Sequence, residues 1–170
     1  MNIVIESERL MLAPITREFA EQIFREFTEN ITTYMYPKSP SKIKETYEFI
    51  DKAIKNMEEN KELQMVVLDK STKEFLGCVG LHSINTKTPE LGIWIKKGAH
   101  GKKYGREAVA TIADWAKNNL TFKYLKYPVD KNNITSRKIP EFLGGVIEAE
   151  YKQTTPYGKQ LDEVEYRIYK

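Results

Sequence analysis

The residues best suited to chemistry in this sequence lie in the segment Glu90–Ala116. Three glycines, Gly98, Gly101 and Gly105, loosen its middle part, and four lysines stand among them: Lys96, Lys97, Lys102 and Lys103. Glycines let a backbone approach a ligand closely, and the free N–H groups at a following helix start attract anions. The segment therefore predicts a phosphate-binding loop. The alternative is a strand-to-helix turn with solvated lysines.

Two other phosphate-binding motifs do not fit the spacing of these glycines. A P-loop requires Gly-x4-Gly-Lys-Ser/Thr, but the fifth residue after Gly98 is Lys103 and the fifth after Gly101 is Arg106. A dinucleotide-binding fingerprint requires Gly-x-Gly-x-x-Gly, which the three glycines do not form. Both classes of nucleotide loop are therefore excluded.

Cysteine and histidine offer little further chemistry. Cys78 is the only cysteine, and within its apolar surroundings a small buried residue is favoured over a nucleophile. One cysteine forms no intramolecular disulfide, which is consistent with a reducing compartment. Besides it there are only His82 and His100, so no metal site is predicted. For His82, which follows a buried-looking strand, a structural role is favoured over contact with a substrate.

Two regular elements must position the glycine loop. Before it, Leu91, Ile93 and Ile95 alternate with Glu90, Gly92 and Trp94, which predicts a strand. After it, apolar residues recur at helical spacing. The remaining elements follow from periodicity and from proline, glycine and capping residues. In the first half they are a short edge strand at 9–15, a helix capped by Thr16 and ending near Glu29, a helix capped by Ser41 and ending near Asn60, and a hairpin of 64–68 with 75–81. In the second half they are a strand at 124–130 that loses pairing at Pro128, a short helix at 132–143, and strands at 146–151 and 164–169. Pro140 should bend or end the short helix unless it lies in the first turn.

Length and charge restrict the class of protein. The chain of 170 residues with 41% hydrophobic residues predicts one domain spanning residues 1–170. The net charge is only +3, yet residues 96–138 hold eleven Lys/Arg against three Asp/Glu. A nucleic-acid surface would explain this basic part, although such surfaces usually interleave aromatic residues or offer a recognition helix. No stretch resembles a signal peptide or a membrane span, so a cytoplasmic protein that binds no membrane is expected.

Four motifs, in order along the chain, resemble one family. The loop reads His-Gly-Lys-Lys-Tyr-Gly over residues 100–105, where the family motif is Gln/Arg-x-x-Gly-x-Gly/Ala. Glu-Leu-Gly-Ile-Trp-Ile precedes it, and Asn133-x-x-Ser136 with Glu141-x-Leu143-Gly144 follows it as one motif. Glu8-Arg9-Leu10-x-Leu12-x-Pro14 opens the chain. This arrangement resembles the GNAT superfamily of N-acetyltransferases, in particular the RimJ/RimL-like branch that acetylates ribosomal-protein N-termini. The likeness covers nearly the whole chain.

The resemblance implies a fold and a reaction. The fold is a mixed α/β class with a mostly antiparallel seven-stranded sheet, splayed middle strands and about four helices. The reaction is acetyl transfer from acetyl-coenzyme A, without a metal, by direct attack of a primary amine in a ternary complex. The acceptor is a peptide, including a ribosomal-protein N-terminus, or a small molecule, and the protein is a monomer or homodimer. The basic residues of 96–138 would then bind the phosphates of coenzyme A, which makes a nucleic-acid partner the less favoured interpretation.

The resemblance also assigns roles to residues. Glu90 is the candidate base, directly or through water, and Ser136 is the candidate acid for the departing thiolate; a salt-bridged carboxylate and a helix-capping serine are the alternatives. Backbone N–H groups around Trp94 to Lys96 are candidate oxyanion donors, and Asn133 is expected to hydrogen-bond the pantetheine arm. The predicted coenzyme-binding residues are Trp94, Ile95, Lys96, His100, Gly101, Lys102, Lys103, Tyr104, Gly105, Arg106, Asn133, Ser136 and Arg137.

Three residues depart from the family pattern. His100 replaces Gln/Arg, Lys103 replaces a glycine, and Pro140 stands where many relatives carry a tyrosine. These departures leave room for a second hypothesis, a non-catalytic sensor of acyl-coenzyme A with the same fold. A third hypothesis is a small RNA-binding module that uses the basic segment, for which strongly salt-dependent binding is expected.

Overall fold

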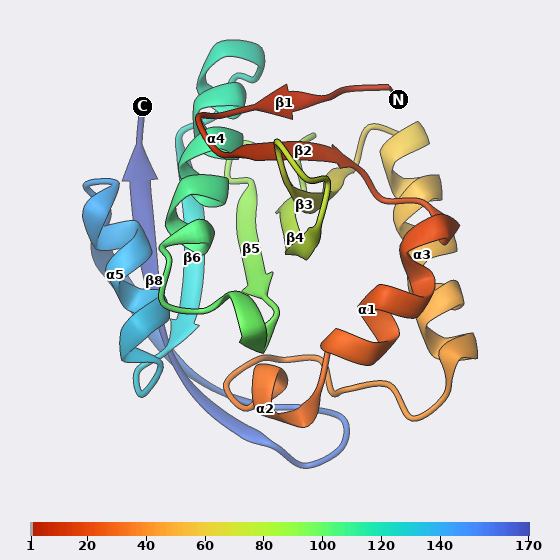
Figure 1. Cartoon of the computed structure of the whole chain (residues 1–170). Coiled ribbons are helices and arrows are strands. Elements are labelled where there is room, and N and C mark those ends of the chain that lie inside the picture. Colours follow the sequence, from red (N-terminus) through yellow and green to blue (C-terminus); the bar gives the residue numbers. More distant parts are fainter. Residues whose placement is uncertain (1) are drawn as a thin grey trace.

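The computed structural model describes residues 2–170, and its centre is an eight-stranded sheet of order β1-β2-β3-β4-β5-β6-β8-β7 (Figure 1). The strands are β1 Ile5–Glu6, β2 Leu10–Pro14, β3 Glu62–Asp69, β4 Phe75–His82, β5 Glu90–Ile95, β6 Tyr124–Asp130, β7 Val146–Thr154 and β8 Gln160–Tyr169. The α-helices are α1 Ala20–Glu26, α2 Glu29–Thr32, α3 Ile43–Glu58, α4 Tyr104–Asn119 and α5 Ile134–Phe142, with short 3-10 turns at Arg17–Phe19 and Lys97–Ala99. The predicted mixed α/β class is confirmed.

The helices cover both faces of the sheet. Helix α4 packs against β4 and β5 and α5 against β6 and β8, whereas α3 packs against β3 and α1 against β4. The alternation predicted for β5 decides which side chains meet which layer. A Cβ on Gly105 of α4 would lie 3.6–3.7 Å from the side chains of Ile95 and Ile93, and the Trp94 ring meets Phe27 at the end of α1 on the other face, with ring centroids 4.9 Å apart.

The sheet opens between β5 and β6. Their register is parallel, but it holds a single paired position, Glu90 with Lys126, whereas the neighbouring β4–β5 and β6–β8 pairs are antiparallel and continuous. Past Glu90 the two strands therefore leave a gap. The splayed middle strands that the family resemblance implies are present.

Pro128 lies at this gap without leaving a broken hydrogen bond. It stands opposite Glu165 in the β6–β8 register, and the Lys131 N–H donates to the carbonyl of Asp162. In an antiparallel ladder the bonding direction alternates, so the missing N–H of Pro128 belongs to the β5 side. The Lys126 N–H, two residues earlier, does point that way and donates to Pro89. The predicted loss of pairing at Pro128 thus falls where β6 has no partner strand.

The N-terminal third differs from the sequence prediction. The single helix expected from Thr16 to Glu29 is divided into three elements: a 3-10 turn, α1 and α2. Phe27 (φ −86°, ψ 70°) and the extended backbone of Thr28 interrupt it between α1 and α2. Thr16 precedes the 3-10 turn, but its side chain makes no capping bond, and within residues 2–170 its buried hydroxyl has no hydrogen-bond partner. The split helix and the two-residue β1 explain why five helices and eight strands exceed the expected four and seven.

Two further boundaries are corrected. The strand predicted at the sheet edge, β2, has β1 on its outer side, with Ile5 opposite Leu12, so β2 is not an edge strand. Helix α3 starts one residue later than a Ser41 cap requires. Its first turn is closed by Glu45, whose carboxylate accepts the N–H groups of Ser41 and Lys42.

Pro140 lies in the last turn of α5 and not in its first. The helix continues through Pro140 and ends two residues later at Phe142, where Gly144 takes the left-handed conformation (φ +78°). The N–H groups of Gly144 and Gly145 then donate to the carbonyls of Glu141 and Pro140, so the helix end is a glycine cap. Within residues 2–170, no helix is long and apolar enough to cross a membrane.

Glu107 ties the start of α4 to the N-terminal strands. Its carboxylate accepts hydrogen bonds from the Ser7 hydroxyl and from the backbone and side chain of Arg9, at 2.6–2.8 Å. Burial alone would raise the pKa of Glu107, but these bonds outweigh it and hold the pKa below the ordinary 4.5. The contact fixes the helix start beside the glycine loop.

Replacing Glu107 with Gln should lower the free energy of unfolding by about 1–2 kcal/mol at pH 7, because a charged acceptor of several hydrogen bonds is lost. A carboxyl with a depressed folded pKa stabilises the fold above its unfolded pKa, and this contribution disappears as the pH falls through the folded pKa. The difference between wild type and Glu107→Gln should therefore shrink below about pH 4.5. Urea unfolding as a function of pH measures it.

Asp114→Asn is the matched control, since Asp114 is an exposed acid on the same helix. Equal destabilisation by both substitutions, or a Glu107→Gln deficit that persists in acid, would contradict the assignment.

Candidate active site

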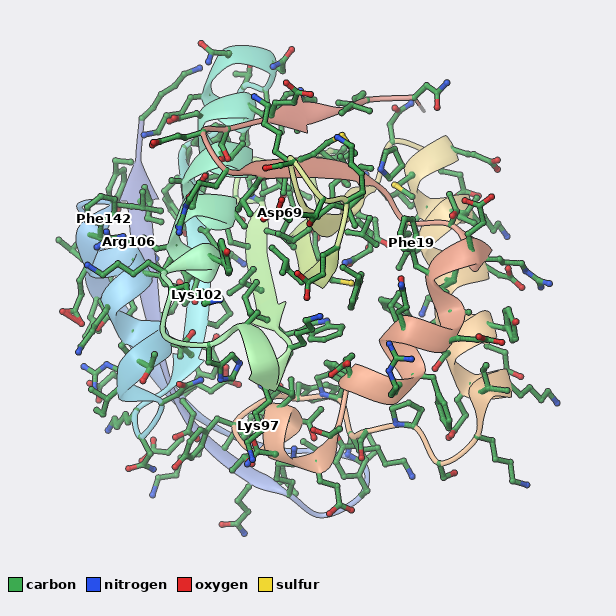
Figure 2. All side chains as sticks on the ribbon, in the orientation of Figure 1. Phe19, Asp69, Lys97, Lys102, Arg106 and Phe142 are labelled. Carbon is green, nitrogen blue, oxygen red and sulfur yellow. The ribbon has the colours of Figure 1, made fainter. Side chains whose placement is uncertain are left out.

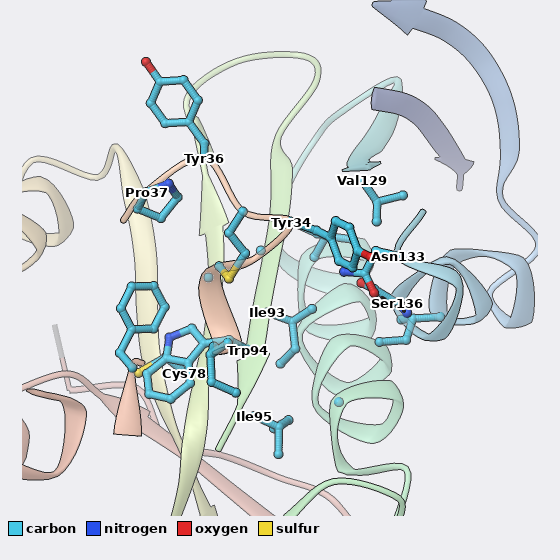
Figure 3. A pocket seen from close by; sticks show the side chains of 18 of the residues that line it. Tyr34, Tyr36, Pro37, Cys78, Ile93, Trp94, Ile95, Val129, Asn133 and Ser136 are labelled. Carbon is cyan, nitrogen blue, oxygen red and sulfur yellow. Dashed lines mark hydrogen bonds between the residues drawn. The ribbon is translucent and has the colours of Figure 1, made fainter. Parts of the chain in front are cut away.

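A cleft of about 1310 Å³ occupies the gap in the sheet. Its walls come from β5, the starts of α4 and α5, and the segment 30–49. In Figure 3, Ile93 and Ile95 of β5 lie between the wall carrying Trp94 and the α5 start carrying Asn133 and Ser136. The cleft thus joins the glycine loop to the far end of β5.

Backbone amides of β5 point into the cleft. The Lys96 N–H donates to Leu76 of β4, at 2.8 Å. Because bonding alternates along an antiparallel pair, the N–H groups of Ile95 and Ile93 face the opposite side, where β6 has departed. Among the predicted oxyanion donors Trp94 to Lys96, the Lys96 amide is therefore committed to the sheet, and the Ile95 amide faces the cleft.

The start of α4 offers an anion site. Its N-cap residue, Lys103, makes no side-chain capping bond, so the first N–H groups of the helix lack a protein acceptor from that residue. Gly101 has φ +84°, and a Cβ placed on it or on Gly98 would meet no atom within 4 Å. The loop is therefore open as well as positive, which fits a phosphate group and hence the expected coenzyme.

Two predicted phosphate contacts are partly engaged within the protein. Nε2 of His100 lies 2.6 Å from the carbonyl oxygen of Ile95, so this nitrogen is engaged in a hydrogen bond that links the glycine loop to the end of β5. The guanidinium of Arg106 stacks over the Phe142 ring at 4.1 Å from its centroid, and both residues lie at the α4–α5 side in Figure 2. Stacking on Phe142 holds the Arg106 charge at the rim of the cleft.

Helix α5 brings a hydroxyl pair to the cleft. Asn133 caps the helix by accepting the Ser136 N–H at 3.3 Å, and the Ser136 hydroxyl lies 2.6 Å from that of Tyr127 on β6. Burial raises the pKa of Tyr127, against the weaker effect of its bond to Ser136. A neutral phenol thus supports the serine hydroxyl.

The other end of the cleft is acidic. Glu90 and Glu163 line it together with Gln64 and His82. Burial raises the pKa of Glu90, although nearby His82 and Lys126 oppose the shift. Burial likewise raises the pKa of Glu163, which accepts a hydrogen bond from Gln153 and feels the charge of Glu90. A half-buried carboxylate with a raised pKa is suited to accept a proton near neutrality.

A loop that lines the cleft is anchored by the C-terminal hairpin. Segment 30–40 carries Tyr34, Tyr36 and Pro37 on the cleft (Figure 3). The ammonium of Lys159, in the β7–β8 hairpin, donates to the carbonyls of Thr32 and Met35 at 2.7 and 2.8 Å. Burial lowers the pKa of Lys159.

Most predicted site residues come together in the cleft. Those that line it are Glu90, Trp94, Ile95, His100, Gly101, Lys103, Tyr104, Gly105, Arg106, Asn133 and Ser136. Lys96, Lys102 and Arg137 do not line it. Lys96 pairs with Glu74 at 3.0 Å, and Arg137 donates to the Tyr166 hydroxyl and to the Lys131 carbonyl. The Lys102 carbonyl accepts from Arg9. Next to Arg137, Lys138 does line the cleft.

Four cleft residues were not predicted to act: Gln64, His82, Tyr127 and Glu163. Each lies on a strand, where the alternation of the sequence predicts which face of the sheet a side chain occupies but not which residues of other strands it meets. Cys78, by contrast, is buried as expected, and burial raises the pKa of its thiol. Within residues 2–170 no group of three or more His, Cys, Asp and Glu side chains is arranged to hold a metal.

Comparison with known proteins gives a family match. The profile described as "Acetyltransferase (GNAT) domain" matches residues 9–146. The uncharacterized N-acetyltransferase YoaA of Bacillus subtilis is 24% identical over 162 residues, 91% of this chain and 92% of that protein. The uncharacterized protein MJ1062 of Methanocaldococcus jannaschii is 33% identical over 81 residues, which cover 47% of this chain but only 16% of that protein.

Solved structures share the fold at low identity. The ribosomal L7/L12 alpha-N-protein acetyltransferase RimL superposes with a TM-score of 0.87 at 13% identity, over 100% of this chain and 96% of that one. Spermidine N-acetyltransferase from Vibrio cholerae, in complex with CoA and spermine, gives 0.83 at 23% identity, over 96% of both chains. These likenesses establish the fold.

Lys103 adopts the left-handed conformation (φ 62°, ψ 25°) at the position where a glycine is usual. Replacing Lys103 with Gly should raise the free energy of unfolding by about 0.5–1 kcal/mol, because a side chain in this conformation carries steric strain. Lys102→Gly is the matched control. Lys102 is not among the positive-φ residues, so added chain freedom should destabilise that variant by about 0.5 kcal/mol. Denaturant unfolding compares the two, and a Lys103→Gly variant no more stable than wild type would refute the strain.

Proposed function

Since the chain belongs to the acetyltransferase (GNAT) family, we propose that it transfers an acetyl group from acetyl-coenzyme A to a primary amine. One observation supports this most strongly. A single cleft has an open, basic helix start at one end and, at the other, the carboxylates of half-buried Glu90 and buried Glu163. An anionic donor and a cationic acceptor can therefore enter the same cleft from opposite sides.

The donor side uses backbone and basic groups. The N–H groups at the start of α4 and the charges of Lys103, Arg106 and Lys138 bind phosphates. The outward N–H groups of Ile93 and Ile95 bind amide or thioester oxygens, and the Ile95 amide is the oxyanion donor. When bound, the coenzyme supplies an acyl carbon that an amine can attack directly.

The acceptor side must remove a proton. At pH 7 an α-amine with a pKa near 7.7–8.0 is roughly one-tenth neutral, whereas a lysine amine is neutral in only a few molecules per ten thousand. Glu90 is the proposed base, acting directly or through water, because it lines the cleft and its pKa is raised. Ser136, bonded to Tyr127, is the proposed proton donor to the departing thiolate.

The acidic end favours a cationic acceptor. Glu163 adds a second carboxylate beside Glu90, so an amine with another positive charge nearby gains attraction, and one with an adjacent carboxylate is repelled. Both a protein N-terminus and a small polyamine satisfy this chemistry. We propose a cytoplasmic location, because the single cysteine is free and buried.

Two measurements test the proposal. Calorimetry with acetyl-coenzyme A should give saturable binding, and thiol release should then appear with an amine panel that spans cationic, neutral and carboxylate-bearing acceptors. The cationic members should react fastest. Acetyl-coenzyme A binding with no turnover on any amine would contradict the proposal and favour an acyl-coenzyme A sensor.

Replacing Glu90 with Gln should lower kcat/KM by about 100-fold or more and leave acetyl-coenzyme A affinity unchanged, because only proton removal is lost. The raised pKa of Glu90 also predicts that wild-type kcat/KM falls as the pH drops through a value above 4.5, and that the variant lacks this limb. Glu58→Gln, at an exposed glutamate of α3, is the control. An unchanged pH profile in Glu90→Gln would remove Glu90 from the mechanism.

A further inference from the structure

We propose that His82 is a proton-relay residue that receives the acceptor's proton from Glu90 on Nε2, and that Glu62 positions it. The inference rests on the proposed amine acetylation. Nothing in the sequence distinguishes His82 from a structural histidine, so the argument depends on where the sheet places its ring.

Three adjacent strands bring three titratable side chains to one face. His82, the last residue of β4, stands directly opposite Glu62 of β3 and Glu90 of β5. The Nδ1 atom of His82 lies 3.0 Å from Oε2 of Glu62. Directly opposed residues have Cβ atoms about 4.5–5.5 Å apart, so Glu90 lies within reach of the same ring.

Two glycines let the ring lie across the cleft floor. A Cβ on Gly80 would come within 2.8 Å of Nε2 of His82, and one on Gly92 within 3.4 Å. The ring therefore occupies space that a side chain at Gly80 would take, and it lies in van der Waals range of Gly92. Both glycines and His82 line the cleft, so Nε2 faces it.

The contact with Glu62 selects the form of the imidazole. A carboxylate only accepts hydrogen bonds, so the proton of the neutral ring belongs on Nδ1, and Nε2 keeps its lone pair. No hydrogen bond among residues 2–170 occupies Nε2. The Glu62 side chain is only 14% exposed, whereas that of His82 is 39% exposed. The ring is thus held on its inner side and open to water on its outer side.

The relay balances as two proton transfers. An N–H bond of the acceptor ammonium breaks, its electron pair stays on nitrogen, and the proton moves to the Glu90 carboxylate, directly or through water. Nε2 then binds the proton, which restores the Glu90 carboxylate and forms an imidazolium. Glu62 and Glu90 flank that charge, with Lys126 and Glu165 near Glu90, and water takes the proton from the exposed ring.

Three substitutions test the relay by different routes. His82→Gln removes the ring, and kcat/KM should fall by about tenfold or more at unchanged acetyl-coenzyme A affinity. Glu62→Gln releases the ring and should have a smaller effect. Gly80→Ala leaves both residues in place but displaces the ring, so it should also slow turnover. In the His82→Gln background Gly80→Ala should add nothing, because its target is already absent.

Rescue separates a relay from a merely structural role. Added imidazole should restore part of the turnover of His82→Ala, since the cleft is open, and should not help Glu90→Gln. A His82→Gln variant with wild-type kcat/KM, additive Gly80→Ala and His82→Gln effects, or lack of imidazole rescue would each overturn the relay.

A second readout needs no acceptor. The sequence has only two histidines, so ¹⁵N spectra of wild type and His82→Gln identify the His82 ring. Its neutral form should carry the proton on Nδ1, and Glu62→Gln should weaken that preference. A wild-type ring protonated on Nε2 would refute the inference even if no acetyl acceptor is found. Absence of turnover in the wild type with the expected tautomer would instead count against the proposed function alone.

Discussion

The departure of β6 from β5 is the constraint on which the site depends. Backbone amides in a folded protein need partners, yet those of Ile93 and Ile95 face a gap instead of a strand. Pro128 keeps the gap from closing into a regular ladder, because the β6 residue that faces it has no N–H to donate. The cleft is therefore a property of the sheet itself, and the helices only border it.

The same strand also keeps two opposing charges apart. Glu90 begins β5 and Ile95 ends it beside the glycine loop, a separation of about 17 Å along the strand. Coulomb interactions weaken with distance, so the cations that oppose the raised pKa of Glu90 are the nearby His82 and Lys126. Burial consequently dominates at the acidic end, and anions are attracted at the other end without loss of the raised carboxyl pKa.

Sequence periodicity predicts the strands, the glycine loop and most cleft residues, because these depend on local patterns. Pairings between distant residues depend on register, which the pattern does not give. A regular hairpin with Leu68 opposite Phe75 would pair Glu62 with Leu81. The bulge at Val67/Leu68 shifts the register by one residue and pairs Glu62 with His82. The break at Phe27 is likewise absent from the pattern, since it occurs within a continuous helical periodicity.

Lys159 joins two segments that are more than a hundred residues apart in the chain. Its ammonium donates hydrogen bonds to the carbonyls of Thr32 and Met35, so the cleft-lining segment 30–40 takes its shape partly from the β7–β8 hairpin. Recombination that moved only the loop between relatives would leave these carbonyls unpaired. The shape of this wall of the cleft therefore depends on the two segments together, and divergence in one requires compensating change in the other.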